Sequence, residues 1–556
     1  MHSPSPSLPP WSRRAFLAGM GAGALPLRPG QAPGDPEDMA AAARLVGLEF
    51  SEDQLDQAKG NLARRRRDYQ ALREQEVPFE LPPCTRFDPV PTGHPAPPTG
   101  PGYTWRAPEA LPAPTDDLQL AFANLSELAV WLRRGDVTSR QLTELSLQRL
   151  EKYDPQLHCV ITLLRDEAIA TAENRDRELA EGRVRGPLHG IPYGAKDLFA
   201  WPSAPTTFGA EPFRNHQWNL RATVLDRLQA QGAVLVAKLS LGALAMGDLW
   251  FGERTRNPWN PDQGSSGSSA GSASATAAGL VPFSLGSETL GSIVSPCTRC
   301  GVAGLRPTFG AVSRHGAMPL SWTMDKVGII ARSAIDQAMV FEAIRGADGR
   351  DPSARDAGFP FDPTKGLRGL RIAVLESQRG LRRPEDRAFL EWLGQQGAET
   401  STLSLPEAPY SGLRLMLSAE AAAVFDDLLR AGGLDALEGQ RDGDWPNHFR
   451  SARMIPAVEM LRASRLRTQL MEDMASTMAD VDVLISGTHD GALLTCTNLT
   501  GHPTAVLPVG VPEGTTGRPN LISLTGQLYG EADILRVAAA WQTATDWHRQ
   551  RPALTS

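Results

Sequence analysis

The feature that most constrains the fold is a run of small residues near the middle of the chain. Residues 264–279 read Gly-Ser-Ser-Gly-Ser-Ser-Ala-Gly-Ser-Ala-Ser-Ala-Thr-Ala-Ala-Gly. Glycine and serine in this density are typical of a flexible linker, but the run passes directly into an alanine-rich, helix-compatible stretch and then into apolar residues 280–283. Small residues at nearly every position indicate a backbone that approaches other backbone, or a ligand, closely. The run therefore predicts a packed element rather than a linker.

The same run contains a match to the nucleophile elbow of α/β-hydrolases. Residues 267–271 fit G-x-S-x-G, with Ser269 in the nucleophile position. That elbow requires a strand immediately before it, whereas residues 256–263 contain Pro258 and Pro261. Because proline disfavours a sheet interior, we expect no strand there, and the elbow interpretation is disfavoured.

Composition narrows the class of protein. The chain has 556 residues, is 41% hydrophobic and 21% charged, and carries a net charge of −7, as expected of a soluble globular protein without a global basic field. We therefore expect no nucleic-acid partner. The cysteines are Cys84, Cys159, Cys297, Cys300 and Cys496. They are too few for a disulfide scaffold, and the C-x-x-C pair lacks the further ligands of a zinc site, so we expect ordinary buried thiols.

The first thirty-two residues predict an export signal. Arg13 and Arg14 precede Phe16 and Leu17 in a twin-arginine pattern. The apolar run over residues 15–27 is too short to span a membrane, and a small-x-small cleavage site follows it at residues 30–32. We expect residues 1–32 to be removed and the mature protein to be periplasmic or secreted.

The remaining chain divides into an extension and one large domain. Residues 33–115 combine a predicted helix over residues 51–76, opened by a capping box of Ser51 and Gln54, with a proline-dense stretch over residues 78–114. Residues 116–550 alternate predicted helices (125–134, 139–153, 165–181) with strands (160–164, 234–237, 370–375, 483–485, 505–508). This alternation predicts an α/β layered fold whose mixed sheet is covered by helices on both faces. We expect residues 376–480 to form a variable region that shapes the substrate pocket.

Three separated pieces together resemble the amidase signature family of serine hydrolases. They are residues 190–197 (Gly-Ile-Pro-Tyr-Gly-Ala-Lys-Asp), residues 267–269 (Gly-Ser-Ser) and residues 286–293 (Gly-Ser-Glu-Thr-Leu-Gly-Ser-Ile), and the resemblance extends from about residue 118 to residue 549. It implies a Ser-Ser-Lys triad in which Ser292 is the nucleophile and Lys196 is the base that acts through Ser268. It also implies a cis peptide bond between Gly267 and Ser268.

A lysine can serve as this base only if it is neutral, which requires burial or a nearby cation to lower its pKa from about 10.4. The resemblance further implies an oxyanion hole made by the backbone N–H groups of Thr289, Leu290 and Gly291, together with that of Ser292. The chain departs from the family pattern at Glu288, Leu290 and Val294, where aspartate, glycine and arginine are usual. A leucine can donate its N–H at this position comfortably only if its φ is negative.

These observations predict an amidase that cleaves an amide C–N bond through an acyl-enzyme on Ser292. No metal or organic cofactor is implied; the expected partner is a small-molecule amide, without stable membrane insertion, and oligomerisation is left open. An esterase or carbamate hydrolase with the same triad is one alternative. The glutaminase component of the amidotransferase that supplies ammonia to misacylated tRNA is another, although it works in the cytosol. A non-catalytic binding protein on an amidase scaffold is a third, because of the departures at Glu288, Leu290 and Val294.

Overall fold

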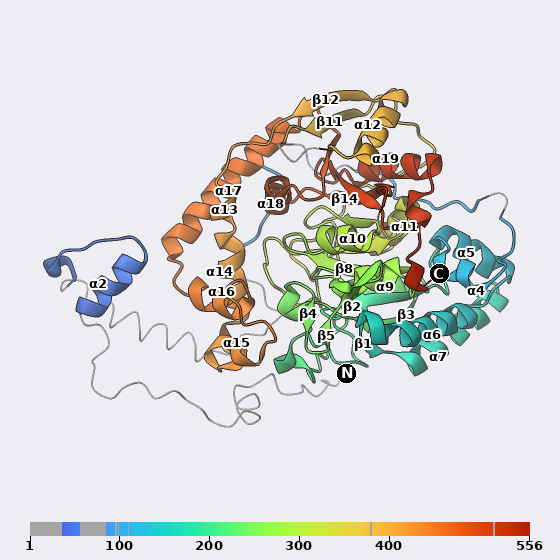
Figure 1. The fold of residues 1–556 in the computed structure, drawn as a ribbon, viewed down its shortest axis with the longest axis horizontal. Helices are drawn as coiled ribbons and strands as arrows, with labels where there is room; N and C mark the ends of the chain where they lie inside the picture. The colour runs from blue at the N-terminus through green and yellow to red at the C-terminus, as the bar shows by residue number, and fades with distance from the viewer. Residues whose placement is uncertain are drawn as a thin grey trace, which may run out of the picture.

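The computed structural model describes residues 36–55, 85–94, 97, 99–108, 111–377, 381–514 and 517–555. Within them, an 11-stranded sheet forms the centre of the molecule (Figure 1). In spatial order its strands are β1 (Val160–Leu163), β3 (Val234–Leu239), β2 (Pro192–Lys196), β8 (Phe283–Glu288), β10 (Lys326–Ala331), β9 (Gly304–Arg306), β14 (Thr504–Gly510), β15 (Asn520–Gly526), β13 (Val483–Gly487), β11 (Arg371–Leu375) and β12 (Glu399–Leu403). The sheet is mixed, because β3, β2 and β8 run parallel at one end and β13, β11 and β12 at the other, with antiparallel pairs between them.

The described helices lie around this sheet, except for α2, which stands apart from it (Figure 1). They are α2 (Pro36–Leu45), α4 (Asp117–Phe122), α5 (Leu125–Arg134), α6 (Ser139–Leu157), α7 (Arg165–Ala180), α8 (Thr223–Ala230), α9 (Ala270–Ala277), α10 (Val294–Cys300), α11 (Ala334–Ile344), α12 (Pro384–Gln395), α13 (Tyr410–Leu413), α14 (Leu415–Val424), α15 (Asp426–Arg430), α16 (Trp445–Ala452), α17 (Ala457–Thr477), α18 (Gly491–Thr500) and α19 (Glu531–Ala544). Short 3₁₀ turns lie at Glu211–Phe213, Ala243–Ala245, Gly433–Ala436, Trp547–Arg549 and Ala553–Thr555.

Both faces of the sheet are covered, which confirms the predicted α/β layered fold. Successive strand residues point to opposite faces. In β10, Ile330 joins the apolar cluster that contains Ala273 of α9 and Val294 of α10. Its neighbour Ile329 joins the larger cluster that includes residues of α11 and α19. Burial on both faces explains why the central strands read as nearly continuous apolar runs.

The predicted helix over residues 125–134 has the bounds of α5 because both of its ends are specified locally. Asn124 and Glu127 form a capping box at its start. Gly135 ends it in the left-handed conformation, with φ of 76°. The predicted helix over residues 139–153 continues to residue 157 in α6, with Pro155 inside its last turn.

The small-residue run packs as predicted. Its second half is α9, in which all eight residues are buried. A Cβ added to Gly267 would lie 1.8 Å from the carbonyl oxygen of Gly247, and one added to Gly271 would lie 2.4 Å from that of Cys159. Two of the serine hydroxyls donate to backbone carbonyls of neighbouring segments, Ser272 to Leu285 and Ser274 to Arg256. Neither glycine can therefore accept a side chain without backbone movement.

The prediction of no strand over residues 256–263 is wrong in detail. β6 (Arg256–Asn257) and β7 (Asn260–Gly264) form a small ribbon outside the main sheet, as do β4 (Leu249–Trp250) and β5 (Glu253–Arg254). Pro258 lies in the connection, and Pro261 is tolerated because this two-stranded ribbon leaves edges that need no ladder donor. The ribbon is not the central-sheet strand that a nucleophile elbow requires.

The N-terminal extension is described only in part. The predicted signal over residues 1–32 lies outside the described residues, as does most of the helix predicted over residues 51–76. The capping box at the start of that helix is present, because the Ser51 and Gln54 side chains each accept the other's backbone N–H. The described residues of the proline-dense stretch contain no helix or strand. They lie along the domain, where Tyr103 packs edge-on against Phe361.

Candidate active site

Lys196 lies at the end of β2, completely buried. Its Nζ donates to Ser268 Oγ at 2.8 Å, Ser287 Oγ at 2.9 Å and Ser269 Oγ at 3.1 Å. Burial lowers the pKa of Lys196 from 10.5 to about 7, although the carboxylates of Asp325 and Glu288 act in the opposite direction. Near neutral pH a large share of this amine is therefore unprotonated and able to accept a proton.

The three predicted triad residues lie on segments that meet at this lysine. Ser268 follows a cis peptide bond from Gly267, which confirms that expectation. Ser292 is joined to the same loop through its carbonyl oxygen, which accepts the backbone N–H of Ser269 at 3.1 Å. Ser292 is 8% exposed, whereas Ser268 is 1% exposed. Ser292 is thus the more accessible of the two predicted triad serines.

Ser269, the nucleophile of the elbow interpretation, occupies a different setting. It is completely buried. Its hydroxyl donates to the carbonyl oxygen of Ser287 at 3.0 Å and accepts the backbone N–H of the same residue at 3.1 Å. The Ser269 hydroxyl therefore fastens the loop to β8 and is poorly placed for attack on a substrate.

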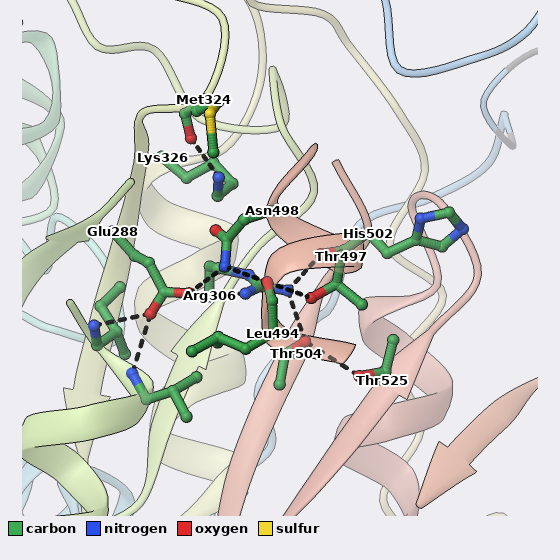
Figure 2. A network of polar contacts seen from close by, with 12 residues as sticks. Glu288, Arg306, Met324, Lys326, Leu494, Thr497, Asn498, His502, Thr504 and Thr525 are labelled. Atoms are coloured by element: carbon green, nitrogen blue, oxygen red, sulfur yellow. Dashed lines mark hydrogen bonds and ion pairs between the residues drawn. The ribbon is translucent and has the colours of Figure 1, made fainter. Parts of the chain in front are cut away.

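The turn that carries Ser292 is held by Glu288 at the end of β8. One Glu288 carboxylate oxygen accepts the backbone N–H groups of Ile293 and Val294, at 2.8 and 3.0 Å. The other is paired with Arg306 at 2.6 Å and accepts from Asn498 at 2.9 Å (Figure 2). Burial alone would raise the pKa of Glu288, but Arg306 and these hydrogen bonds lower it to about 2. Glu288 has one methylene more than the aspartate that is usual here in the family that the sequence resembles. Its ionised carboxylate has a protein partner on each oxygen and so clamps the turn that carries Ser292.

The predicted oxyanion segment follows Glu288 directly. Gly291 has φ of 89°, whereas Leu290 is not among the residues with positive φ. Leucine at position 290 therefore imposes no left-handed strain, and the glycine is retained where a left-handed conformation is needed. The hydroxyl of Thr289 donates to Asp325 at 2.6 Å, and burial raises the pKa of that carboxyl.

A pocket of about 80 Å³ adjoins this segment. Its lining includes Ser287, which contacts Lys196, and Thr289 of the predicted oxyanion segment. The rest of its wall is mainly apolar or small, with the charged residues Arg314, Asp325, Lys326, Arg350 and Asp351.

Most of the charged side chains around this pocket form ion pairs or hydrogen bonds within the protein. Arg314 pairs with Asp351 at 2.9 Å. Asp325 accepts the backbone N–H groups of Leu320 and Ser321 in addition to the hydroxyl of Thr289. Burial lowers the pKa of Lys326 well below its usual value, and its amine donates to the carbonyl oxygen of Met324 (Figure 2).

Two contacts connect the predicted substrate-shaping region with the pocket wall. Glu420 of α14 accepts from the hydroxyl of Ser321, and Arg467 of α17 donates to the carbonyl oxygen of Thr323. These contacts flank Trp322, which lines the pocket. They bring the region into position to influence pocket shape, which remains a prediction.

The cysteines and the potential metal-ligating side chains form no further site in the described part of the chain. Cys159, Cys297, Cys300 and Cys496 are free and buried, as expected of ordinary thiols; Cys84 lies outside the described residues. The described part of the chain contains no group of three or more histidine, cysteine, aspartate or glutamate residues placed to hold a metal ion. In the same part, no helix has the length and apolar character needed to cross a bilayer.

Sequence reasoning missed several residues of this site. Ser287 belongs to the third matched motif piece but was assigned no role, although its hydroxyl is as close to Lys196 as that of Ser268. The clamp formed by Arg306 and Asn498 on Glu288 was also missed. A signal existed for Ser287 and Arg306, since both stand within or just after the motif that carries Ser292. Asn498 lies within the extent of the family resemblance, but nothing in the sequence pairs it with Glu288, 210 residues away.

Comparison with known proteins places this geometry in a family. The sequence matches the family described as Amidase over residues 141–535. The chain belongs to the amidase family. It is an enzyme of the kind that acts on carbon–nitrogen bonds.

Relatives of this amidase match over most of their length. It is 34% identical over 480 residues to the A subunit of the glutamyl-tRNA(Gln) amidotransferase of Roseiflexus sp. (strain RS-1), covering 77% of this chain and 98% of the relative. The peptide amidase from Stenotrophomonas maltophilia matches with a TM-score of 0.69 and 29% identity, covering 78% of this chain and 99% of that one. A protein from a vestigial complex linked to the origins of an s-triazine catabolic enzyme matches with a TM-score of 0.70 and 27% identity, covering 76% and 98%.

Proposed function

We propose that the protein hydrolyses a small amide through an acyl-enzyme on Ser292. Ser292 Oγ attacks the carbonyl carbon, and its proton passes to Ser268 while Ser268 passes its own proton to Lys196. The tetrahedral intermediate collapses, the C–N bond breaks, and the leaving nitrogen receives the proton back along the same route. Water then attacks the ester, gives its proton to Lys196 through Ser268, and Ser292 departs as it regains a proton.

The observation that carries this proposal is the 2.8 Å contact between Lys196 Nζ and Ser268 Oγ, made by a lysine with a pKa of about 7. A serine hydroxyl needs a base within hydrogen-bond reach to act as a nucleophile, and a base with a pKa near the operating pH is the most effective. The backbone N–H groups of residues 289–292 supply the proposed oxyanion donors, each typically worth about 100- to 1000-fold in rate.

The pocket favours an uncharged substrate. Most of its charged residues already have partners in the protein, as in the pair of Arg314 with Asp351, whereas Arg350 is exposed. An additional charge on the acyl group would bear a desolvation cost that the internally paired residues do not offset. The peptide amidase resemblance supports an amide substrate, and the relatives named as components of an amidotransferase support an assembly with other chains as the alternative to be tested.

The twin-arginine pattern at Arg13 and Arg14 supports export of the protein and stands against a cytosolic tRNA-linked role. Replacing both arginines by lysine should retain the protein in the cytosol, measured by cell fractionation. Co-purification of the wild-type protein with tRNA and two further chains would instead support the amidotransferase alternative.

A matched substrate series tests the reaction class. Primary amide, methyl ester and carbamate derivatives of one neutral acyl group should be assayed with wild type, Lys196→Met and Ser292→Ala. Ser295→Ala is the matched control, because Ser295 lies in the next turn and its hydroxyl contacts Ser266 at 2.8 Å. We expect amide turnover that is lost in the first two variants and kept in the control. Turnover of the ester or carbamate alone would support the alternative hydrolases, and turnover of none by folded protein would support a binding function.

A further inference from the structure

Exposed apolar side chains gather in two places far apart in the sequence. Among the described residues, nine large hydrophobic side chains are exposed. Four belong to residues 36–55, here called the N-terminal arm: Leu45, Val46, Leu48 and Phe50. Four more form what is here called the α17 stripe: Met454, Val458, Leu461 and Leu466. Isolated exposed apolar residues are ordinary, but contiguous groups mark interaction surfaces.

The α17 stripe lies on the outer side of its helix. Val458 and Leu461 are three residues apart in α17, which places them on one face of that helix, and Met454 lies in the turn before Ala457, where the helix begins. The opposite side is buried against the domain through residues that include Ala463 and Leu470. A surface helix normally presents polar residues outward, so the exposed fraction of 72% at Val458 and 67% at Leu461 leaves an apolar face without cover in the described part of the chain.

The charges beside the two groups are complementary. Glu49, Glu52 and Asp53 are exposed in the N-terminal arm. Arg462 and Arg465 are exposed beside the α17 stripe and outnumber the exposed Glu459 between Val458 and Leu461. An apolar contact flanked by opposite charges gains both burial and a preferred register.

The chain itself brings the arm to the stripe. Residues 85–94 already lie against α17, because the guanidinium of Arg467 stacks 3.6 Å from the ring centroid of Phe87. From Arg467 to Val458 is about 14 Å along the helix axis, at about 1.5 Å per residue. Residues 56–84 connect the arm to this anchor, and even at about 1.5 Å per residue, the rise of the helix predicted over residues 51–76, they are long enough to cover that span.

We propose that the N-terminal arm docks on the α17 stripe of its own chain, with Leu48 and Phe50 covering Val458 and Leu461. In Figure 1 the arm's helix α2 stands apart from the body, beyond the flank formed by α14, α16 and α17. The docked arm braces α17, whose Arg467 donates to the carbonyl oxygens of Thr323 and Leu499. The arm thereby steadies the wall of the pocket from outside. This inference does not depend on the proposed reaction.

Cysteine cross-linking in the full chain tests the contact. In a Cys84→Ser background the remaining cysteines are buried, so Phe50→Cys with Leu461→Cys supplies one exposed pair for a short bismaleimide. Peptide mass spectrometry should find the link within one chain. Adding Val458→Glu should lower its yield by about tenfold, because an apolar contact worth at least 1.4 kcal/mol is replaced by a buried charge.

The matched control pairs Phe50→Cys with Val184→Cys, since Val184 is the ninth exposed hydrophobic residue and belongs to neither group. This pair should give little product. Equal yields from the two pairs, or a yield unaffected by Val458→Glu, would overturn the proposal. A 1:1 mixture of ¹⁵N-labelled and unlabelled protein should give no mixed-isotope link; a mixed link would overturn docking within one chain and would assign the stripe to a second copy.

Discussion

The dependence of activity on pH follows from the burial of Lys196. An ordinary lysine with a pKa of 10.5 would be neutral in about one molecule in 3,000 at pH 7, whereas a pKa of about 7 makes half of the molecules competent. The downward shift corresponds to about 5 kcal/mol of preference for the neutral amine in the folded protein. We therefore expect kcat/KM to rise about tenfold per pH unit up to an apparent pKa near 7 and then to level off.

Asp325→Asn is the perturbation that isolates the electrostatic part of this account. The Asp325 carboxylate raises the pKa of Lys196 against the effect of burial, so its removal should move the apparent pKa of the rising limb toward acid, by up to about one unit. The apparent pKa of the rise in kcat/KM is the quantity to compare between the variants. The maximal rate is not used, because Asp325→Asn also loses hydrogen bonds and its maximal rate should fall. Asp351→Asn is the control, since this carboxylate lines the same pocket but is paired with Arg314.

The assay is kcat/KM for a non-titrating amide between pH 5 and pH 10, in a buffer of constant ionic strength. A wild-type kcat/KM that still rises tenfold per unit at pH 10, or that falls throughout this range, would refute the neutral-lysine base. A limb that stays in place in Asp325→Asn, or that moves equally in Asp351→Asn, would refute the assigned cause of the shift.

Three further outcomes are expected. Glu288→Gln should lower the free energy of unfolding by about 3–5 kcal/mol in urea titration, because it leaves the guanidinium of Arg306 buried without its counter-charge; an unchanged midpoint would show that the clamp is dispensable. Gly291→Ala should lower kcat more than it changes KM, since alanine is strained by about 1–2 kcal/mol at φ of 89° and its Cβ would lie 3.1 Å from Leu494. Gly491→Ala, where a Cβ meets nothing within 4 Å, should leave kcat unaltered. Incubation with EDTA followed by desalting should leave activity intact, and full loss restored by a divalent cation would contradict the metal-free mechanism.

Prediction from sequence succeeded where the determinants are local. The helix over residues 125–134 was delimited correctly because Asn124, Glu127 and Gly135 specify its ends within a few residues. The packed small-residue run was recognised because it passes directly into an alanine-rich, helix-compatible stretch and then into apolar residues, which a flexible linker does not require. The position of Lys196 at a strand end followed from a motif, not from periodicity.

Prediction failed where the determinants are distant or weak. The ribbon that includes residues 256–257 and 260–264 is only a few residues long, and its prolines outweighed a pairing too small to leave a pattern. The complete burial of Lys196 cannot be predicted from its motif alone, because it depends on strands β3 and β8 on either side of β2. The Asn498 contact to Glu288 joins segments 210 residues apart, and no single sequence reveals such a pair.

The central claim is that Ser292 is the nucleophile activated by Lys196, and covalent labelling tests it most directly. The purified full chain should be treated with a fluorophosphonate and the modified peptide identified by mass spectrometry, with Ser292→Ala, Ser269→Ala and Lys196→Ala in parallel. The account predicts labelling at Ser292 that is abolished in Ser292→Ala, strongly slowed in Lys196→Ala and retained in Ser269→Ala. Labelling at Ser269, or no labelling of folded wild-type protein, would contradict it.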